Sequence, residues 1–135
     1  MQLLTWEPQH SVGVQELDEQ HKKIFAIINR LYDAMQTTDE KKNLGEILEE
    51  MRDYCDQHFS LEEKYFDLFH YEDRESHEAQ HRFFREKSRE FIQTYAVDGV
   101  TLSFDVLDFL EDWWFKHINN VDKKYTKCFQ EHGLQ

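Results

Sequence analysis

Residues that interrupt helices are scarce in this chain. Its 135 residues include one proline, Pro8, and only four glycines. Because proline and glycine are the residues that most often stop a helix, most of the sequence contains no strong breaker. No segment shows the strand-like alternation of apolar and polar residues. A largely helical fold is therefore predicted.

Positive charge is also in short supply. The chain has 16 Lys and Arg against 28 Asp and Glu, which gives a formal net charge of −12. Acidic residues flank the few basic pairs, so no basic stripe is available to neutralise phosphates. We expect no nucleic-acid partner. An anionic membrane surface would repel the chain for the same reason.

Cysteines and long apolar runs are rare as well. Cys55 and Cys128 lie in apolar stretches and are expected to be buried reduced thiols, rather than a disulfide or a nucleophile. The N-terminus lacks the pattern of a secretory signal, and no apolar run is long enough to cross a bilayer. These absences predict a soluble cytoplasmic protein. The length of the chain predicts one domain over residues 1–135.

Four amphipathic stripes follow an irregular N-terminal arm of about residues 1–17. In each stripe, apolar residues recur every three or four positions, as one face of a helix requires. The stripes run from His21 to Met35, from Leu44 to Tyr65, from His77 to Tyr95 and from Val106 to Cys128. Short connections make sequential helices antiparallel, which predicts an all-α, antiparallel up-and-down four-helix bundle.

Polar residues and one glycine mark the predicted helix ends. Thr37, Thr38 and Asp39 offer oxygens that could cap the second helix. The second and third helices are expected to be joined by residues 69–73. Asp98-Gly99 is expected to close the third helix, and Thr101 or Ser103 is expected to cap the fourth.

Histidines and acids occupy inward positions of the stripes where a Leu or Ile would be expected. They are His21, His58, Glu62, His77, His81, His117 and Asp122. Two of the pairs, His58 with Glu62 and His77 with His81, have members four residues apart, so both side chains of a pair can reach the same inward point. Imidazoles and carboxylates are ligands of non-haem iron or zinc. The set predicts a buried metal site.

Burial of these groups needs compensation, because one unpaired buried polar group costs about 1–3 kcal/mol and a charge costs far more. Bound metal would remove that cost. Five histidines are too many for one ion. Two ions need about ten to twelve ligand positions, and the imidazoles, two bridging carboxylates and a shared oxygen would fill all but about one. The remaining position would be open to a small ligand.

The sequence closely resembles the hemerythrin family, specifically its single-domain bacterial members. The resemblance includes these positions and extends over essentially the whole chain. The matching segments are Trp6 followed by SVGVQELDEQHKKIF, HFSLEE from His58, HEAQH from His77, and WWFKHINNVD ending at Asp122. The resemblance implies a cofactor of two iron ions, Fe²⁺ or Fe³⁺, with a bridging oxo or hydroxo group.

The resemblance also implies a role for each ligand. One iron would be held by His77, His81 and His117, and the other by His21 and His58. Glu62 and Asp122 would bridge the two ions. The implied function is reversible dioxygen binding by a carrier, store or scavenger that is not an enzyme.

Two other functions stay open at this point. One is an oxygen or redox sensor that signals to a separate protein partner, and the other is a di-iron enzyme with peroxidase or nitric oxide chemistry. Four-helix di-iron oxidases use four Glu with two ExxH motifs that pair up, and no ExxH pairs up in that way here, which favours binding over substrate oxidation. We expect a monomer or a weak oligomer.

Three aromatic residues match positions that wall the oxygen site in the family, Phe25, Phe59 and Trp113, although a helical core would use such rings anyway. Trp114 is a fourth pocket candidate and departs from the family. Where Trp114 stands, three residues before the last histidine, the family usually has a leucine. The indole could narrow the pocket, or it could turn toward a neighbouring helix and leave the pocket unchanged.

The spacing of His117 and Asp122 is irregular for a helix, since five residues correspond to a rotation of about 140°. We therefore predict a local widening over residues 117 to 122, of the π type that often occurs at functional sites. The remaining histidines, His10, His70 and His132, are expected to be solvated surface residues.

Overall fold

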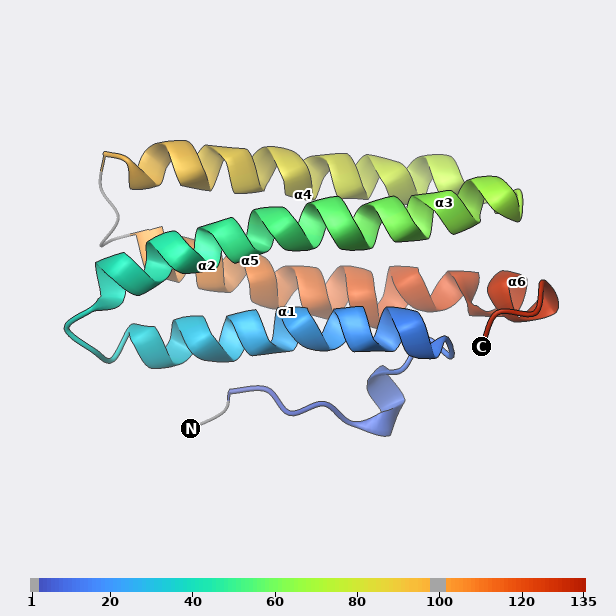
Figure 1. Ribbon diagram of the computed structural model, residues 1–135, viewed down its shortest axis with the longest axis horizontal. Helices are drawn as coiled ribbons and strands as arrows, with labels where there is room; N and C mark the ends of the chain where they lie inside the picture. The colour runs from blue at the N-terminus through green and yellow to red at the C-terminus, as the bar shows by residue number, and fades with distance from the viewer. Residues whose placement is uncertain (1–2, 98–101) are drawn as a thin grey trace.

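The computed structural model describes residues 3–97 and 102–135, and its helices form four rods that lie side by side (Figure 1). We use "rod" for a continuous helical stretch. The first rod is α1 (Gln15–Ala34) and the third is α4 (Arg74–Tyr95). The second rod comprises α2 (Glu40–Tyr54), η2 (Cys55–Phe59) and α3 (Ser60–Leu68). The fourth comprises α5 (Leu102–Trp113), η3 (Trp114–Val121), η4 (Asp122–Tyr125) and α6 (Thr126–Glu131). The predicted antiparallel bundle is confirmed.

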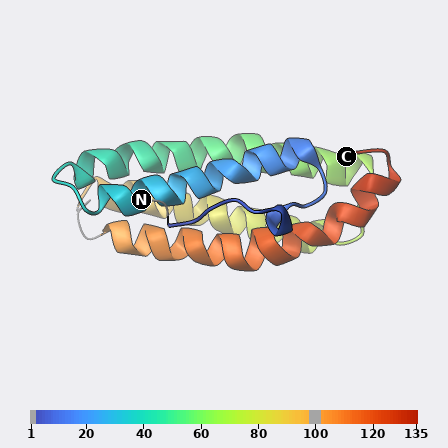
Figure 2. The same ribbon diagram turned by 90° about the horizontal axis from the view of Figure 1, so that it is seen from below.

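The N-terminal arm crosses the outside of the bundle between α1 and the fourth rod (Figure 2). It is shorter than predicted, because α1 begins at Gln15, and it contains one short helix, η1 (Pro8–His10). Its backbone carbonyls accept hydrogen bonds from side chains of the fourth rod, from Lys123 to Gln9 and from Gln130 to Gly13. These contacts fix the arm along the rods.

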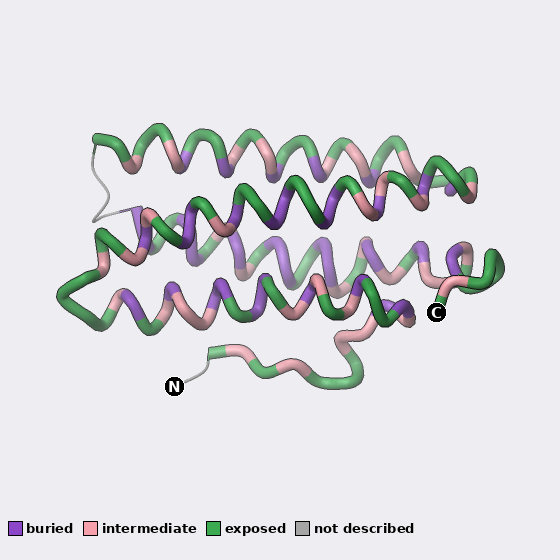
Figure 3. Tube along the Cα trace, viewed as in Figure 1, coloured by how far each residue is buried: buried purple, intermediate pink, exposed green. Residues whose placement is uncertain are grey.

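Buried positions recur along each rod (Figure 3). The apolar residues among them form two clusters. The larger cluster contains buried residues of all four rods, such as Ile28, Leu48, Phe84 and Leu110. The smaller cluster includes Val14, Phe66, Tyr125 and Phe129, near the start of α1 and the end of the fourth rod. Among the described residues, no helix is long and apolar enough to span a membrane.

Two rods contain π-helical turns. The fourth rod widens over Trp114–Val121, which confirms and extends the widening predicted for residues 117 to 122. Because a π turn pairs residues five apart, His117 and Asp122 can both face the bundle interior. The second rod has a further π turn over Cys55–Phe59, which includes His58 and was not predicted.

The predicted helix ends are partly wrong. Thr37 donates its hydroxyl hydrogen bond back to the Ala34 carbonyl at the end of the first rod, so it does not cap the second. Asp39 stands at the N-cap position of α2, but its side chain makes no cap hydrogen bond. Ser103 lies inside α5, where its hydroxyl is fully buried, so it is not a cap. The predicted connection at residues 69–73 is confirmed. Asp98, Gly99 and Thr101 lie outside the described residues.

Candidate metal centre

All seven predicted ligand residues meet in the middle of the bundle. They come from every rod, and each is at most 2% exposed. Their ligand atoms form two groups, each with all atoms within 4.8 Å of one another. One group is Glu62, His77, His81, His117 and Asp122, and the other is His21, His58, Glu62 and Asp122. The two groups share both carboxylates.

Each shared carboxylate directs one oxygen toward each group. Asp122 places Oδ1 2.8 Å from Nε2 of His77 and 3.0 Å from Nε2 of His117, and it places Oδ2 3.0 Å from Nε2 of His21. Glu62 places Oε1 3.0 Å from Nε2 of His81 and Oε2 3.2 Å from Nε2 of His58. Each carboxylate therefore lies between the two groups of imidazoles.

Most of the nitrogen and oxygen atoms that converge in the cluster lack a hydrogen-bond partner. Within the described residues, none of the five Nε2 atoms has a hydrogen-bond partner, and neither do Oε1 of Glu62 and both oxygens of Asp122. Buried polar atoms in native proteins nearly always have a partner. A cluster of unpartnered nitrogens and carboxylate oxygens is therefore the donor set that a metal ion would complete.

Three of the histidines are oriented by side chains that the sequence did not single out. Nδ1 of His58 lies 2.5 Å from Oε1 of Gln20, Nδ1 of His81 lies 2.8 Å from Oε2 of Glu63, and Nδ1 of His117 lies 2.7 Å from Oε1 of Gln80. Since each of these oxygens is an acceptor, each Nδ1 donates. The lone pair of Nε2 then faces the cluster, as a metal ligand requires.

One feature of the sequence could have indicated these three residues. Each is the neighbour of a ligand residue, Gln20 before His21, Glu63 after Glu62, and Gln80 before His81. This places the three side chains at the level of the cluster. Their actual partners lie on other rods, and only the structure shows that.

Charges inside the cluster are balanced by protons in the absence of metal. Burial alone would lower the pKa of His21, but Asp122 and Glu62 outweigh it and raise that pKa to about 9. The same balance raises the pKa of His77 to about 10. Burial would raise the pKa of Glu62, yet the imidazoles around it hold that pKa well below its usual range. Two anions thus face two imidazolium cations, whose charge a metal could replace.

Aromatic rings stack on four of the ligand histidines. Tyr125 of the smaller apolar cluster stacks on His77 at 5.8 Å, and the other three rings belong to the larger apolar cluster. Phe59 lies parallel to His81 with ring centroids 3.9 Å apart, and Trp113 lies nearly parallel to His117 at 3.9 Å. Tyr54, which the sequence did not suggest, stacks on His58 at 5.0 Å. These last three rings shield the cluster from water on the side of the larger apolar cluster.

The other two pocket candidates pack against each other. The rings of Phe25 and Trp114 lie 4.7 Å apart, and Trp114 also contacts His10 of the arm at 4.6 Å. Trp114 therefore contacts α1 through Phe25, which is itself a pocket candidate, so both alternatives for the effect of the indole on the pocket stay predictions. His10 was predicted to be solvated and is instead partly buried, because it packs between Trp6, Phe25 and Trp114.

His70 and His132 are exposed, as predicted. Both cysteines are free thiols, which confirms the expected reduced state. Cys55 is buried as predicted, whereas Cys128 is only partly buried, because it lies on the edge of the smaller apolar cluster.

The fold and the site define a four-helix bundle with a buried histidine and carboxylate cluster that could hold metal ions. Residues 12–128 match the family model described as the hemerythrin HHE cation binding domain. The chain belongs to the hemerythrin family.

The chain is similar to several bacteriohemerythrins over most of their length. It is 29% identical over 132 residues to a bacteriohemerythrin of Stenotrophomonas maltophilia, covering 98% of this chain and 85% of the relative. It is 30% identical over 129 residues to the bacteriohemerythrin of Methylococcus capsulatus, covering 95% and 98%. Identity to a Pseudomonas aeruginosa bacteriohemerythrin is 32% over 123 residues, covering 91% and 79%.

Solved structures agree with this assignment. The crystal structure of a wild-type hemerythrin matches with a TM-score of 0.84 and 30% identity, covering 93% of this chain and 97% of that one. A mutant hemerythrin matches with a TM-score of 0.85, covering 95% and 98%.

Proposed function

We propose that this protein binds dioxygen reversibly at a non-haem di-iron centre. The observation that carries the proposal is the pair of ligand groups that share Glu62 and Asp122, in which none of the five Nε2 atoms has a hydrogen-bond partner among the described residues. The membership in the hemerythrin family and the bacteriohemerythrin relatives support it.

In this proposal His77, His81 and His117 hold one iron, and His21 and His58 hold the other. Glu62 and Asp122 would serve both ions, and an oxo or hydroxo group would complete the cofactor. These donors would leave about one position unfilled, on the side of His21 and His58, for a small ligand. When bound, the pair of irons supplies two electrons and this open position to a small ligand.

The residues around the ligands keep the site in a state suited to binding. Gln20, Glu63 and Gln80 hold the imidazoles in the tautomer that presents Nε2 to the metal. Phe59 and Trp113 exclude water from one side of the cluster, which limits the access of protons and favours release of the ligand over irreversible oxidation of the irons.

Proton-transfer groups are held in their neutral forms. Burial and the nearby carboxylates raise the pKa of Tyr54 and of Tyr125 well above the usual value, so neither phenol releases its proton near neutral pH. Burial raises the pKa of the Cys55 thiol to about 12. This supports ligand binding over an enzymatic reaction that needs an acid or a base.

The test is reconstitution with ferrous iron under argon, followed by admission of air and repeated oxygen removal while the visible spectrum is recorded. We expect a ligand-to-iron charge-transfer band that appears with oxygen and disappears without it. Rapid irreversible oxidation would reject reversible binding and leave the sensor and enzyme functions.

A pair of variants tests the ligand assignment. His58→Ala should reduce the iron content below that of the unchanged protein, because it removes one of the two imidazoles of its group. His70→Asn is the matched control, since His70 is exposed and has a positive φ that asparagine tolerates. Equal iron content in all three proteins would reject the assignment.

A further inference from the structure

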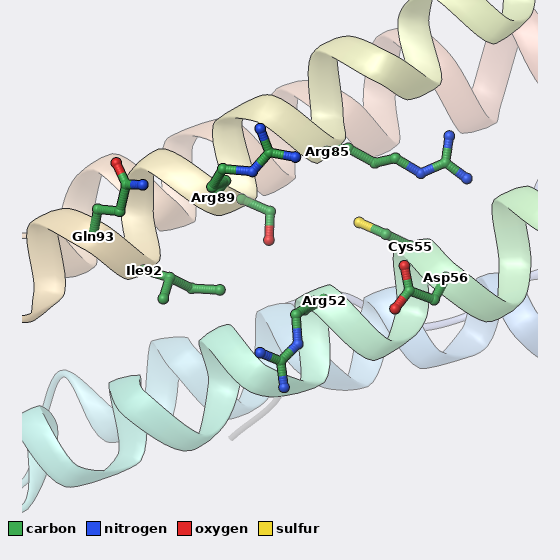
Figure 4. A pocket seen from close by; sticks show the side chains of 8 residues that line it. Arg52, Cys55, Asp56, Arg85, Arg89, Ile92 and Gln93 are labelled. Carbon is green, nitrogen blue, oxygen red and sulfur yellow. The ribbon is translucent and has the colours of Figure 1, made fainter.

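A second candidate site lies on the outside of the bundle, between the second and third rods (Figure 4). It is a groove of about 400 Å³ with arginines around it, Arg52 from α2 and Arg85 and Arg89 from α4. Asp56 is an acidic residue in the same lining. The lining charge is therefore positive on a chain whose net charge is −12.

Two of these arginines have no counter-ion. Arg52 and Arg89 are exposed, and neither makes an ion pair with any residue that the structure describes. Arg30, on the same bundle, is paired with both Glu46 and Glu50. In a protein so rich in acids, two unpaired arginines in the lining of one groove leave room for an external anion, which their guanidinium groups would reach by turning toward each other (Figure 4).

The wall of the groove carries an unused hydroxyl. Ser88 lines it with only 3% of its surface exposed, and Oγ has no hydrogen-bond partner in the described part of the chain. Buried hydroxyls rarely lack a partner. A ligand that accepts a hydrogen bond would supply one.

The third arginine connects this groove to the candidate metal centre. Nη1 of Arg85 lies 3.4 Å from Oε2 of Glu63, and the same oxygen lies 2.8 Å from Nδ1 of His81. The Arg85 guanidinium also lies 5.3 Å from the ring centroid of Phe59, the ring that stacks on His81. An anion that draws Arg85 toward the groove would therefore weaken the ion pair between Arg85 and Glu63, and Glu63 is the residue that contacts Nδ1 of the ligand His81.

We propose that the groove between α2 and α4 binds an oxyanion with the geometry of phosphate, and that its binding alters the metal centre through Arg85, Glu63 and His81. Guanidinium groups recognise phosphate oxygens in pairs, and a tetrahedral oxyanion has enough acceptors for several arginines and a hydroxyl at once. The coupling rests on the proposed di-iron function, whereas the binding does not.

Binding is tested by isothermal titration of the iron-loaded protein with inorganic phosphate. We expect saturable binding of one phosphate per chain, weakened at least about 10-fold in Arg52→Gln and in Arg89→Gln. Arg82→Gln is the matched control, because Arg82 is an exposed arginine of α4 outside the groove lining, and it should bind like the unchanged protein.

Two results would overturn the site. One is the absence of saturable binding. The other is unchanged affinity in both arginine variants, which would place the phosphate elsewhere, such as at the metals. Ser88→Ala should weaken binding less than either arginine variant does, since it removes one neutral donor; equal affinity would exclude Ser88 from the site.

Coupling is tested by the visible spectrum of the same protein with and without phosphate, under argon and again in air. We expect a shift of the iron bands in the unchanged protein and in Arg82→Gln, and none in Arg52→Gln at the same phosphate concentration. Phosphate binding without a spectral shift would overturn the coupling and keep the anion site. Failure of reversible oxygenation would leave the titration result intact.

Discussion

Tyr125 donates a hydrogen bond of 2.6 Å to Oε2 of Glu62, across 63 positions of the chain and between two side chains that are fully buried. The bond joins η4 to α3 beside the cluster. It makes the two oxygens of Glu62 different, because Oε1 has no hydrogen-bond partner among the described residues.

Replacement of Tyr125 by phenylalanine should weaken metal retention by about 10-fold to 100-fold, the usual effect of removing a residue that orients a ligand. Competition with a chelator under argon measures this. Tyr65→Phe is the control, since Tyr65 donates to Glu16 away from the cluster. If both variants retain iron equally, the hydrogen bond does not position Glu62 for metal.

The metal-free protein should lose stability as the pH rises. The pKa values of His21 and His77 are about 9 and about 10 in the folded state, above the ordinary 6.5. Their contribution is complete below pH 6.5 and is lost as the pH rises through 9 to 10, on the order of a few kcal/mol. Thermal melts of metal-free protein between pH 6 and 10 measure it; a flat profile would contradict it.

Metal loading should release protons and raise the melting temperature. At pH 7, His21 and His77 carry protons in the metal-free fold and must lose them to coordinate, which predicts release of about two protons per chain. Titration with ferrous iron under argon in two buffers of different ionisation enthalpy gives the number. Bound metal stabilises only the folded chain, so equal melting temperatures with and without iron would count against the site.

Trp114→Leu should lower the free energy of unfolding by about 2 kcal/mol, because it leaves a cavity beside Phe25 and His10. Urea unfolding measures the change. Phe115→Leu is the control, since the next side chain is 61% exposed and should change stability by no more than about 0.5 kcal/mol. Equal effects in the two variants would mean that the Trp114 contacts contribute nothing.

Oxygenation of the Trp114→Leu protein answers a separate question. The indole turns toward α1 and the arm, so we expect oxygen association and autoxidation rates close to those of the unchanged protein. Stopped-flow measurements on the iron-loaded proteins compare these rates. A large change would mean that Trp114 shapes the path of the ligand after all.

The ligand cluster was predictable because its residues replace apolar ones at helical spacing. The five-residue step from His117 to Asp122 even predicted the π turn of the fourth rod. The π turn over Cys55–Phe59 was not predictable, since His58 and Glu62 are four residues apart and an ordinary helix satisfies that spacing.

Contacts between rods could not be predicted from the sequence. Gln20 and Gln80 look like solvent-facing polar residues, and their roles depend on how one rod is rotated against its neighbour. The same holds for His10, whose burial depends on the course of the arm, and for Trp114, whose direction depends on its rotamer. That the chain forms one domain over residues 1–135 stays a prediction.

The sharing of Glu62 and Asp122 between both ligand groups has a consequence for folding accuracy. If the second or the fourth rod slid by one residue, one carboxylate would leave both groups at once, and each ion would lose a donor. A chain assembled in the wrong register could then complete neither half of the cluster. Metal uptake would thus select correctly aligned molecules from misaligned ones.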